Sequence, residues 1–139
     1  MVKKLIFLIL IFPLASFISC GGGGGGGSSS GGSGSDVSGT WSGSYNSSRF
    51  GAQTMTLNLQ QNGGSVTGTY SSSTGALGTV SGSVSGNTAT VTITVTTPGC
   101  SGTFSGTSIL NSSTTMSVSY TGSSTCGGQE SGTGNLTKQ

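Results

Sequence analysis

The sequence predicts an all-β domain, an eight-stranded up-and-down antiparallel barrel, and three observations lead to it. From Asp36 onward, apolar residues recur with the two-residue period of a strand, and no segment shows the period of a helix. Turn residues cut this region into eight short segments rich in β-branched and aromatic residues. The region carries almost no charge that could protect an open sheet edge, and a closed barrel has no edges.

The expected strands are separated by Gly, Asn, Ser and Pro. Several share one pattern of apolar residue, hydroxyl residue, Gly, hydroxyl residue and apolar residue, as in Trp41–Tyr45 and Val80–Val84. On a strand this pattern places Gly and the apolar residues on the inner face and the hydroxyls on the outer face. Interior glycines mark bends or close approaches, which a small curved sheet needs. The strands are expected at residues 39–46, 53–61, 65–72, 78–86, 88–97, 102–110, 115–123 and 130–138.

Turn signals set the register of the hairpins. Asn62–Gly63 is a strong two-residue turn signal and pairs Leu59 with Val66. Gly86–Asn87 is a second signal, and a third hairpin turns near Ser113. In each hairpin the apolar residues of both strands fall on one face. A shift of the pairing by one residue would turn the apolar side chains of one strand to the other face.

The first twenty residues have the parts of a secretory signal peptide. Lys3 and Lys4 precede an apolar run that is short for a membrane span and is interrupted by Pro13. Ser19–Cys20 at the end of this run resembles the lipobox of bacterial lipoproteins. The resemblance implies cleavage before Cys20 and acylation of the new N-terminal cysteine.

We therefore expect three parts: a lipoprotein signal peptide over residues 1–19, a lipidated Cys20 with a flexible Gly/Ser tether over residues 20–35, and the barrel domain over residues 36–139. Gly21 takes the place of the Asp that resembles an inner-membrane retention signal. The resemblance thus implies a bacterial cell envelope, and the outer membrane within it, with the lipid anchor as the link to the membrane.

Export places the cysteines of the domain in an oxidising compartment, where an even pair forms a disulfide. The register of the third hairpin puts Cys100 opposite Cys126. In the chain-entropy model the bridge adds about 3–4 kcal/mol to the free energy of unfolding. The two cysteines lack the spacing and the further ligands of a zinc site, so we expect no metal and no cofactor.

The composition beyond the cleavage site excludes several function classes. Arg49 and Lys138 balance Asp36 and Glu130, and a neutral domain has no electrostatic footprint for nucleic acid. There is no His, the commonest general base and metal ligand. One acid lies at the tether junction and the other starts the last expected strand, whereas a glycosidase needs two carboxylates that face each other. We expect a protein that is not an enzyme.

The first strand and the first hairpin resemble a known superfamily. Gly39–Trp41, followed by a hairpin that ends in Thr67–Tyr70, resembles the calycins, which include lipocalins and avidins. The layout of residues 39–75 is especially similar to that of streptavidin-type chains. The resemblance implies a barrel with a ligand inside.

The avidin side of this resemblance implies ligand contacts for Tyr70, Ser72 and Ser47, although the later tryptophans of that family's biotin site are absent. The lipocalin side implies that Trp41 stacks under a basic residue from the last strand, which here is Lys138.

The inner face of the expected barrel is aromatic, which supports two interpretations. The first is a lipid-anchored envelope protein that binds a small apolar or amphipathic ligand in its barrel. The alternative is a structural or surface-coat lipoprotein with a solid core and no small-molecule ligand. Buried tyrosine hydroxyls would bond water, Ser108 or a ligand, which we expect to be uncharged because no charge is placed inside. The expected ligand contacts are Trp41, Tyr45, Tyr70, Phe104 and Tyr120.

Overall fold

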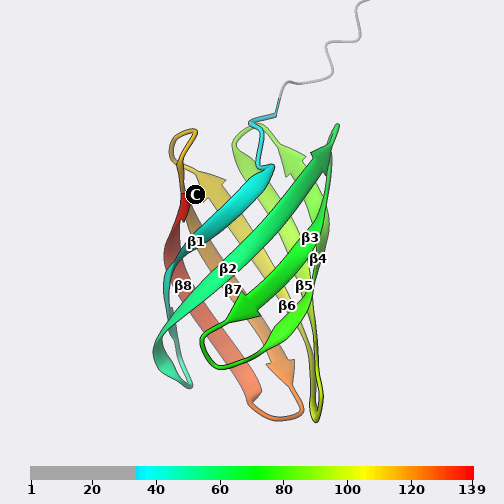
Figure 1. Ribbon diagram of the computed structural model, residues 1–139, viewed down its shortest axis with the longest axis vertical. Helices are drawn as coiled ribbons and strands as arrows, with labels where there is room; N and C mark the ends of the chain where they lie inside the picture. Colours follow the sequence, from blue (N-terminus) through cyan, green and yellow to red (C-terminus); the bar gives the residue numbers. More distant parts are fainter. Residues whose placement is uncertain (1–33) are drawn as a thin grey trace, which may run out of the picture.

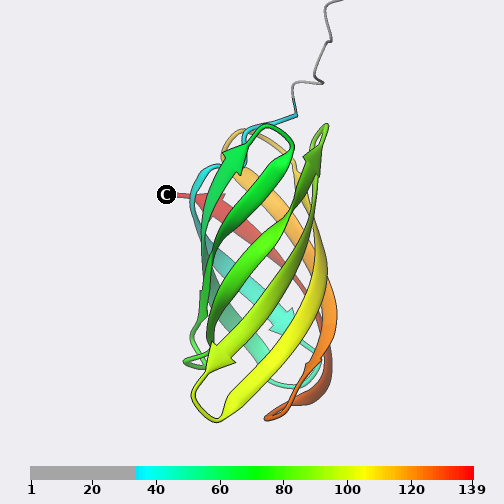
Figure 2. The same ribbon diagram turned by 90° about the vertical axis from the view of Figure 1, so that its right-hand side faces the viewer.

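The computed structural model describes residues 34–139, so the expected signal peptide, Cys20 and nearly all of the expected tether lie outside the described residues. The described chain forms a closed barrel in which each strand pairs with the next and β8 returns to β1 (Figure 1 and Figure 2). The predicted fold class is confirmed.

Within residues 34–139 no helical segment qualifies as a membrane span. The strands are β1 (Gly39–Ser47), β2 (Gly51–Asn62), β3 (Ser65–Ser72), β4 (Leu77–Ser85), β5 (Thr88–Thr97), β6 (Cys100–Leu110), β7 (Thr115–Ser124) and β8 (Gly128–Lys138).

Two of the predicted hairpin registers are confirmed. β4 and β5 pair Val84 with Ala89 around the Gly86–Asn87 turn. β6 and β7 pair Leu110 with Met116. In both hairpins the apolar side chains of neighbouring strands meet inside the barrel, where such cross-strand pairs stabilise a sheet.

The predicted register of the first hairpin is wrong by two residues. Leu59 lies opposite Gly68 rather than Val66. The turn is made by Gly63 and Gly64, not by the Asn–Gly pair that begins one residue earlier. The first turn position has a left-handed φ of 59° at Gly63, a conformation that glycine adopts without the steric cost that asparagine would incur. A shift of two residues keeps every side chain on its predicted face, so the core is unchanged.

Interior glycines allow neighbouring strands to approach closely. A Cβ added at Gly82 would collide with the carbonyl oxygen of Thr90 and lie 2.8 Å from the Cα of Val91 on β5. A Cβ added at Gly43 would lie 2.9 Å from the Cα of Leu136 on β8. The role predicted for the repeated inner glycines, close approach within a curved sheet, is confirmed at these positions.

The two ends of the barrel differ. The closed end carries the β2–β3, β4–β5 and β6–β7 turns together with Gly34 and Gln139, the first and last described residues. The open end carries the β1–β2, β3–β4, β5–β6 and β7–β8 connections (bottom of Figure 1).

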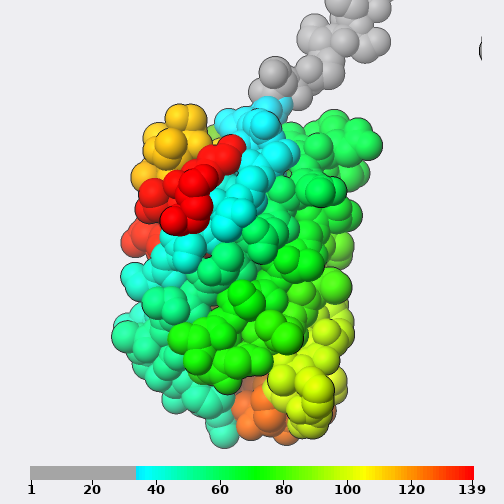
Figure 3. Space-filling model, in the orientation of Figure 1, coloured from blue at the N-terminus to red at the C-terminus, as the bar shows by residue number. Residues whose placement is uncertain are grey.

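The segment before β1 covers the closed end. Ser35 donates a backbone hydrogen bond to the carbonyl oxygen of Gly86 over 2.8 Å, and the amide of Val37 donates to Oε1 of Gln61 over 2.9 Å. Figure 3 shows the first described residues, in cyan, against the C-terminal residues, in red. Beneath this segment the barrel is filled, because the largest fully buried side chains are Trp41, Met116, Leu136, Val37 and Val66.

Candidate functional site

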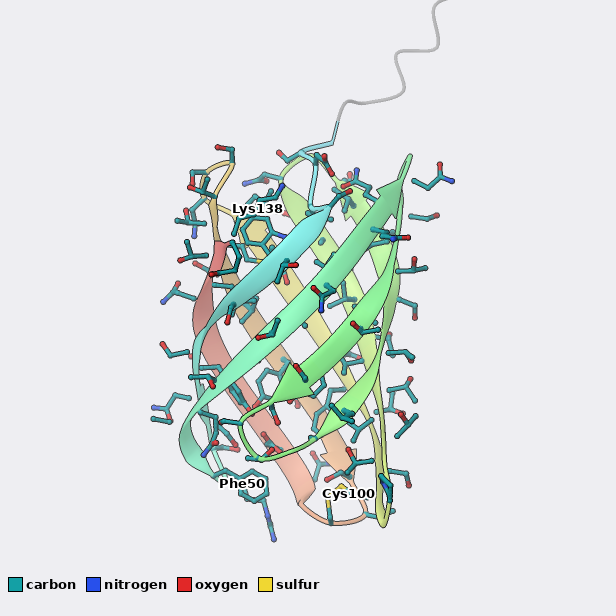
Figure 4. The ribbon with its side chains drawn as sticks, in the orientation of Figure 1. Phe50, Cys100 and Lys138 are labelled. Carbon is teal, nitrogen blue, oxygen red and sulfur yellow. A yellow bond between two sulfur atoms is a disulfide. The ribbon has the colours of Figure 1, made fainter. Side chains whose placement is uncertain are left out.

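A cavity of about 300 Å³ opens at the unfilled end of the barrel. Strands β1 to β3 and β5 to β8 supply its inner wall, and the open-end connections supply its rim. Figure 4 shows the rim at the bottom, where Phe50 and Cys100 are labelled. The lining residues are mostly apolar or aromatic: Tyr45, Phe50, Met55, Tyr70, Thr74, Gly75, Ala76, Ile93, Val95, Thr97, Cys100, Phe104, Tyr120, Ser124, Cys126 and Glu130.

Four of the five predicted ligand contacts lie together in this cavity. Tyr45, Tyr70, Phe104 and Tyr120 reach it from β1, β3, β6 and β7. The ring centroid of Tyr120 lies 5.8 Å from that of Tyr45 and 5.9 Å from that of Phe104, and both pairs meet edge to face. Such pairs are favourable beyond the area that they bury. Tyr45, Tyr120 and Phe104 therefore form one continuous aromatic wall.

The fifth predicted contact, Trp41, lies outside the cavity at the closed end. Its side chain is fully buried, and its indole Nε1 donates a 2.8 Å hydrogen bond to the carbonyl oxygen of Val37. The Nζ of Lys138 lies 5.5 Å from the centre of the ring, as the lipocalin resemblance implied. Trp41 therefore holds the covering segment in place and has no contact with the cavity.

Glu130 is the cavity residue that sequence reasoning missed. It was placed only at the start of the last strand, yet its side chain points into the barrel with 9% of its surface exposed. Its Oε1 accepts hydrogen bonds from Ser47 over 2.8 Å and from the hydroxyl of Tyr120 over 2.7 Å. The partner of Tyr120 is thus Glu130 and not Ser108, and the expectation that no charged residue lies inside is wrong.

The hydroxyl of Ser47 is held in one orientation. Its Oγ accepts hydrogen bonds from the backbone amides of Arg49, over 3.2 Å, and Phe50, over 3.1 Å. With its lone pairs engaged in this way, its proton is directed at Glu130. The tight β1–β2 connection thereby positions the carboxylate through the hydroxyl of Ser47.

The tyrosine hydroxyls of the cavity are held in their neutral form. Burial raises the pKa of Tyr45 well above its usual range, and the neighbouring Tyr70 adds to the rise. Burial raises the pKa of Tyr120 as well, followed by its hydrogen bond to Glu130, which favours the protonated phenol. Both hydroxyls therefore remain hydrogen-bond donors at neutral pH.

These raised pKa values predict a loss of stability in alkali. Above pH ~10, the ordinary pKa of tyrosine, the unfolded chain releases protons from Tyr45 and Tyr120 that the folded chain keeps. The free energy of unfolding should then fall with rising pH, by up to about 1.4 kcal/mol per pH unit for each tyrosine. Urea denaturation at a series of pH values measures the slope. A Tyr45→Phe, Tyr120→Phe double variant should flatten it, and an unchanged slope would contradict the assignment.

The predicted disulfide is present at the rim. Cys100, at the start of β6, is bonded to Cys126 in the β7–β8 connection, with 5.2 Å between their Cα atoms. Both cysteines line the cavity. The bridge therefore fixes two neighbouring parts of the opening relative to each other.

The comparisons with known proteins concern the fold. No family model and no curated protein sequence matches the chain. Among solved structures, EF1p2_mFAP2b bound to DFHBI is similar with a TM-score of 0.61 and 18% identity, over 74% of this chain and 94% of that one. The redesigned barrel mFAP1 bound to DFHBI has a TM-score of 0.57 and 17% identity, over 73% and 94% of the two chains.

A third similar structure is a fluorescence-activating β-barrel designed de novo, with a TM-score of 0.55 and 22% identity, over 74% of this chain and 94% of that one. At such low identity the likeness extends to the fold and not to individual side chains. The chain is a closed eight-stranded β-barrel, and its fold resembles the folds of these barrels.

Proposed function

We propose that this chain is a lipid-anchored protein of the bacterial envelope, attached to the outer membrane, whose barrel binds a small and mainly apolar molecule. The observation that carries the binding role is the aromatic cavity at the open end. Its volume of about 300 Å³ lies at the small end of the range for ligand sites. Its lining combines many apolar groups with a few convergent polar ones, as ligand sites do.

Two further observations support binding rather than catalysis. Two of the structures with a similar fold have been solved bound to DFHBI, which supports a binding role for a barrel of this kind. The two acids of the described chain lie at opposite ends, with Asp36 exposed at the closed end and Glu130 inside the open end. They do not form the facing pair that acid–base hydrolysis of a sugar requires.

Ligand binding should raise the stability of the domain. A small-aromatic and lipid panel, screened by thermal shift, should contain compounds that raise the melting temperature. At 100 times its Kd, a ligand adds about 2.7 kcal/mol to the free energy of unfolding. Native mass spectrometry of protein from its own host would show a retained ligand directly.

A matched pair of variants locates the binding. Ala76→Trp adds a large ring to the lining of the cavity, whereas Ala52→Trp adds the same ring to an exposed position on β2. The first variant should abolish the thermal shift and the second should retain it. If no compound shifts the wild-type protein and no ligand is retained, the alternative of a structural lipoprotein replaces this proposal.

The membrane anchor is tested through Cys20. Its position after a basic and apolar leader predicts acylation, and more than one acyl chain is needed for stable anchoring. Cys20→Ala should move the protein from the membrane fraction to the soluble fraction and abolish the incorporation of labelled fatty acid. Membrane attachment that survives this substitution would refute the anchor.

A further inference from the structure

We infer that the cavity takes an organic cation, a molecule whose apolar or aromatic body lies among the rings and whose ammonium group reaches Glu130. The inference rests on the proposed function and adds the chemical class of the ligand. It replaces the uncharged ligand that the sequence predicted, because the structure places a carboxylate in the wall of the cavity.

The hydrogen bonds of Glu130 leave one of its oxygens free. Ser47 and Tyr120 both donate to Oε1, and no residue of the described chain donates to Oε2. Within residues 34–139 no fully buried side-chain polar atom lacks a hydrogen-bond partner, so Oε2 remains accessible. Since Glu130 lines the cavity, a ligand donor can reach this oxygen from inside it.

No salt bridge joins Glu130 to a cationic side chain of the described chain, although the guanidinium of Arg49 lies beside Gly128 at the same end of the barrel. Arg49 and Lys138 are the cationic side chains beyond the expected cleavage site. Lys138 lies over Trp41 at the closed end, and the side chain of Arg49 is exposed at the rim. A charge that is largely removed from water without a partner is unfavourable, and a cationic ligand would supply the partner. An anionic ligand would place a second negative charge beside Glu130.

The aromatic wall favours the same kind of ligand. The rings of Tyr45, Tyr70, Phe104 and Tyr120 line the same cavity as the carboxylate, and the hydroxyl of Tyr120 donates to it. The face of an aromatic ring attracts a cation within about 6 Å, and cages of such rings recognise quaternary ammonium groups. A carboxylate combined with several rings therefore selects a positive charge on an organic molecule over a strongly hydrated metal ion.

The rest of the cavity suits the apolar part of this ligand. β5 lies across the barrel from β1, and its residues Ile93 and Val95 line the cavity. Met55 on β2 adds a flexible apolar side chain that adapts to irregular shapes. A ligand that enters between the open-end connections can thus place its charge against β8 and its body against β5.

The test compares three probes that differ only in one group: phenylpropylammonium, phenylpropanol and phenylpropanoate. Calorimetry uses the full chain with Cys20→Ala, so that no acyl chain competes for the cavity. The ammonium compound should bind roughly 10–100-fold more tightly than the alcohol, the range expected for a hydrogen bond to a charged group, and the carboxylate should bind most weakly.

Glu130→Gln should remove the preference for the ammonium compound, because the amide keeps the acceptor for Ser47 and Tyr120 but carries no charge. Asp36→Asn is the matched control, since it removes one negative charge at the exposed closed end. It should leave the preference unchanged. Loss of the preference in Glu130→Gln alone would support the inference.

The outcomes separate the inference from the proposed function. Equal binding of the three probes to the wild-type protein, or a preference that survives Glu130→Gln, would overturn the cation while leaving a ligand-binding barrel. Binding of other compounds but of none of these three would overturn it as well. A complete lack of binding by these probes and by the wider panel would remove the proposed function together with the inference.

Discussion

Replacing Trp41 by alanine should lower the free energy of unfolding by about 3–5 kcal/mol, the usual cost of removing a large buried aromatic side chain. The indole is fully buried in the filled half of the barrel, so its removal leaves a cavity that the neighbouring strands cannot close. The substitution also leaves the carbonyl oxygen of Val37 without its donor and removes the ring on which Lys138 lies. Urea denaturation followed by circular dichroism measures the loss.

Two milder variants divide this effect into its parts. Trp41→Phe keeps most of the apolar volume but removes the N–H, so it should lose about 1 kcal/mol through the hydrogen bond and a further amount through the smaller ring. Lys138→Met keeps a long apolar stem and removes the charge over the ring, at a cost of about 0.5–1 kcal/mol. If Trp41→Ala costs no more than Lys138→Met, the indole does not hold the closed end together.

Replacing Gly82 by alanine should destabilise the barrel by about 1–3 kcal/mol, as overpacking does. The new methyl group would collide with the backbone oxygen of Thr90 and lie 2.8 Å from the Cα of Val91, and neither atom can move without separating β4 from β5. This cost opposes a gain of about 0.4–1 kcal/mol, because alanine has less freedom than glycine in the unfolded chain. The collision is with backbone, so it outweighs the gain.

Gly64 provides the matched control for this substitution. A Cβ there would have the carbonyl oxygen of Val84 as its neighbour, at an ordinary contact distance of 3.7 Å, and its φ is not left-handed. Gly64→Ala should therefore be neutral or slightly stabilising in the same denaturation experiment. Equal effects of the two substitutions would show that close approach of the strands does not explain the inner glycine.

The face of the barrel on which each side chain lies could be predicted. Successive residues of a strand point alternately inward and outward, so the face depends only on whether a residue has an odd or an even place along its strand, which is its parity. That parity placed Tyr45, Tyr70, Phe104 and Tyr120 inside, and all four line the cavity. It survived the error in the first hairpin, because a shift of two residues preserves it. The register itself depended on which turn residue is left-handed, and the sequence offered two adjacent glycines for that position.

The same alternation could also have placed Glu130 on the inner face of the barrel. It lies six residues before Leu136, an inward residue of β8, and the same face passes through the glycines between them. Sequence reasoning placed Glu130 only at the start of the last expected strand and did not assign it a face. The volume of the cavity could not be predicted, because it depends on how far the partners of the inner glycines fill the space that those glycines leave.

The position of both ends of the described chain at the closed end determines how the protein can be attached to a surface. Gly34 and Gln139 both lie there, and the backbone amide of Gln139 donates to the carbonyl oxygen of Thr40 over 2.9 Å. A bead or an electrode attached before Gly34 or after Gln139 would therefore stand behind the barrel, with the opening turned toward the bulk liquid. Phe50 is exposed at the opposite rim and offers a position for a reporter group (Figure 4). Immobilisation and read-out would thus occupy opposite ends of the same small protein.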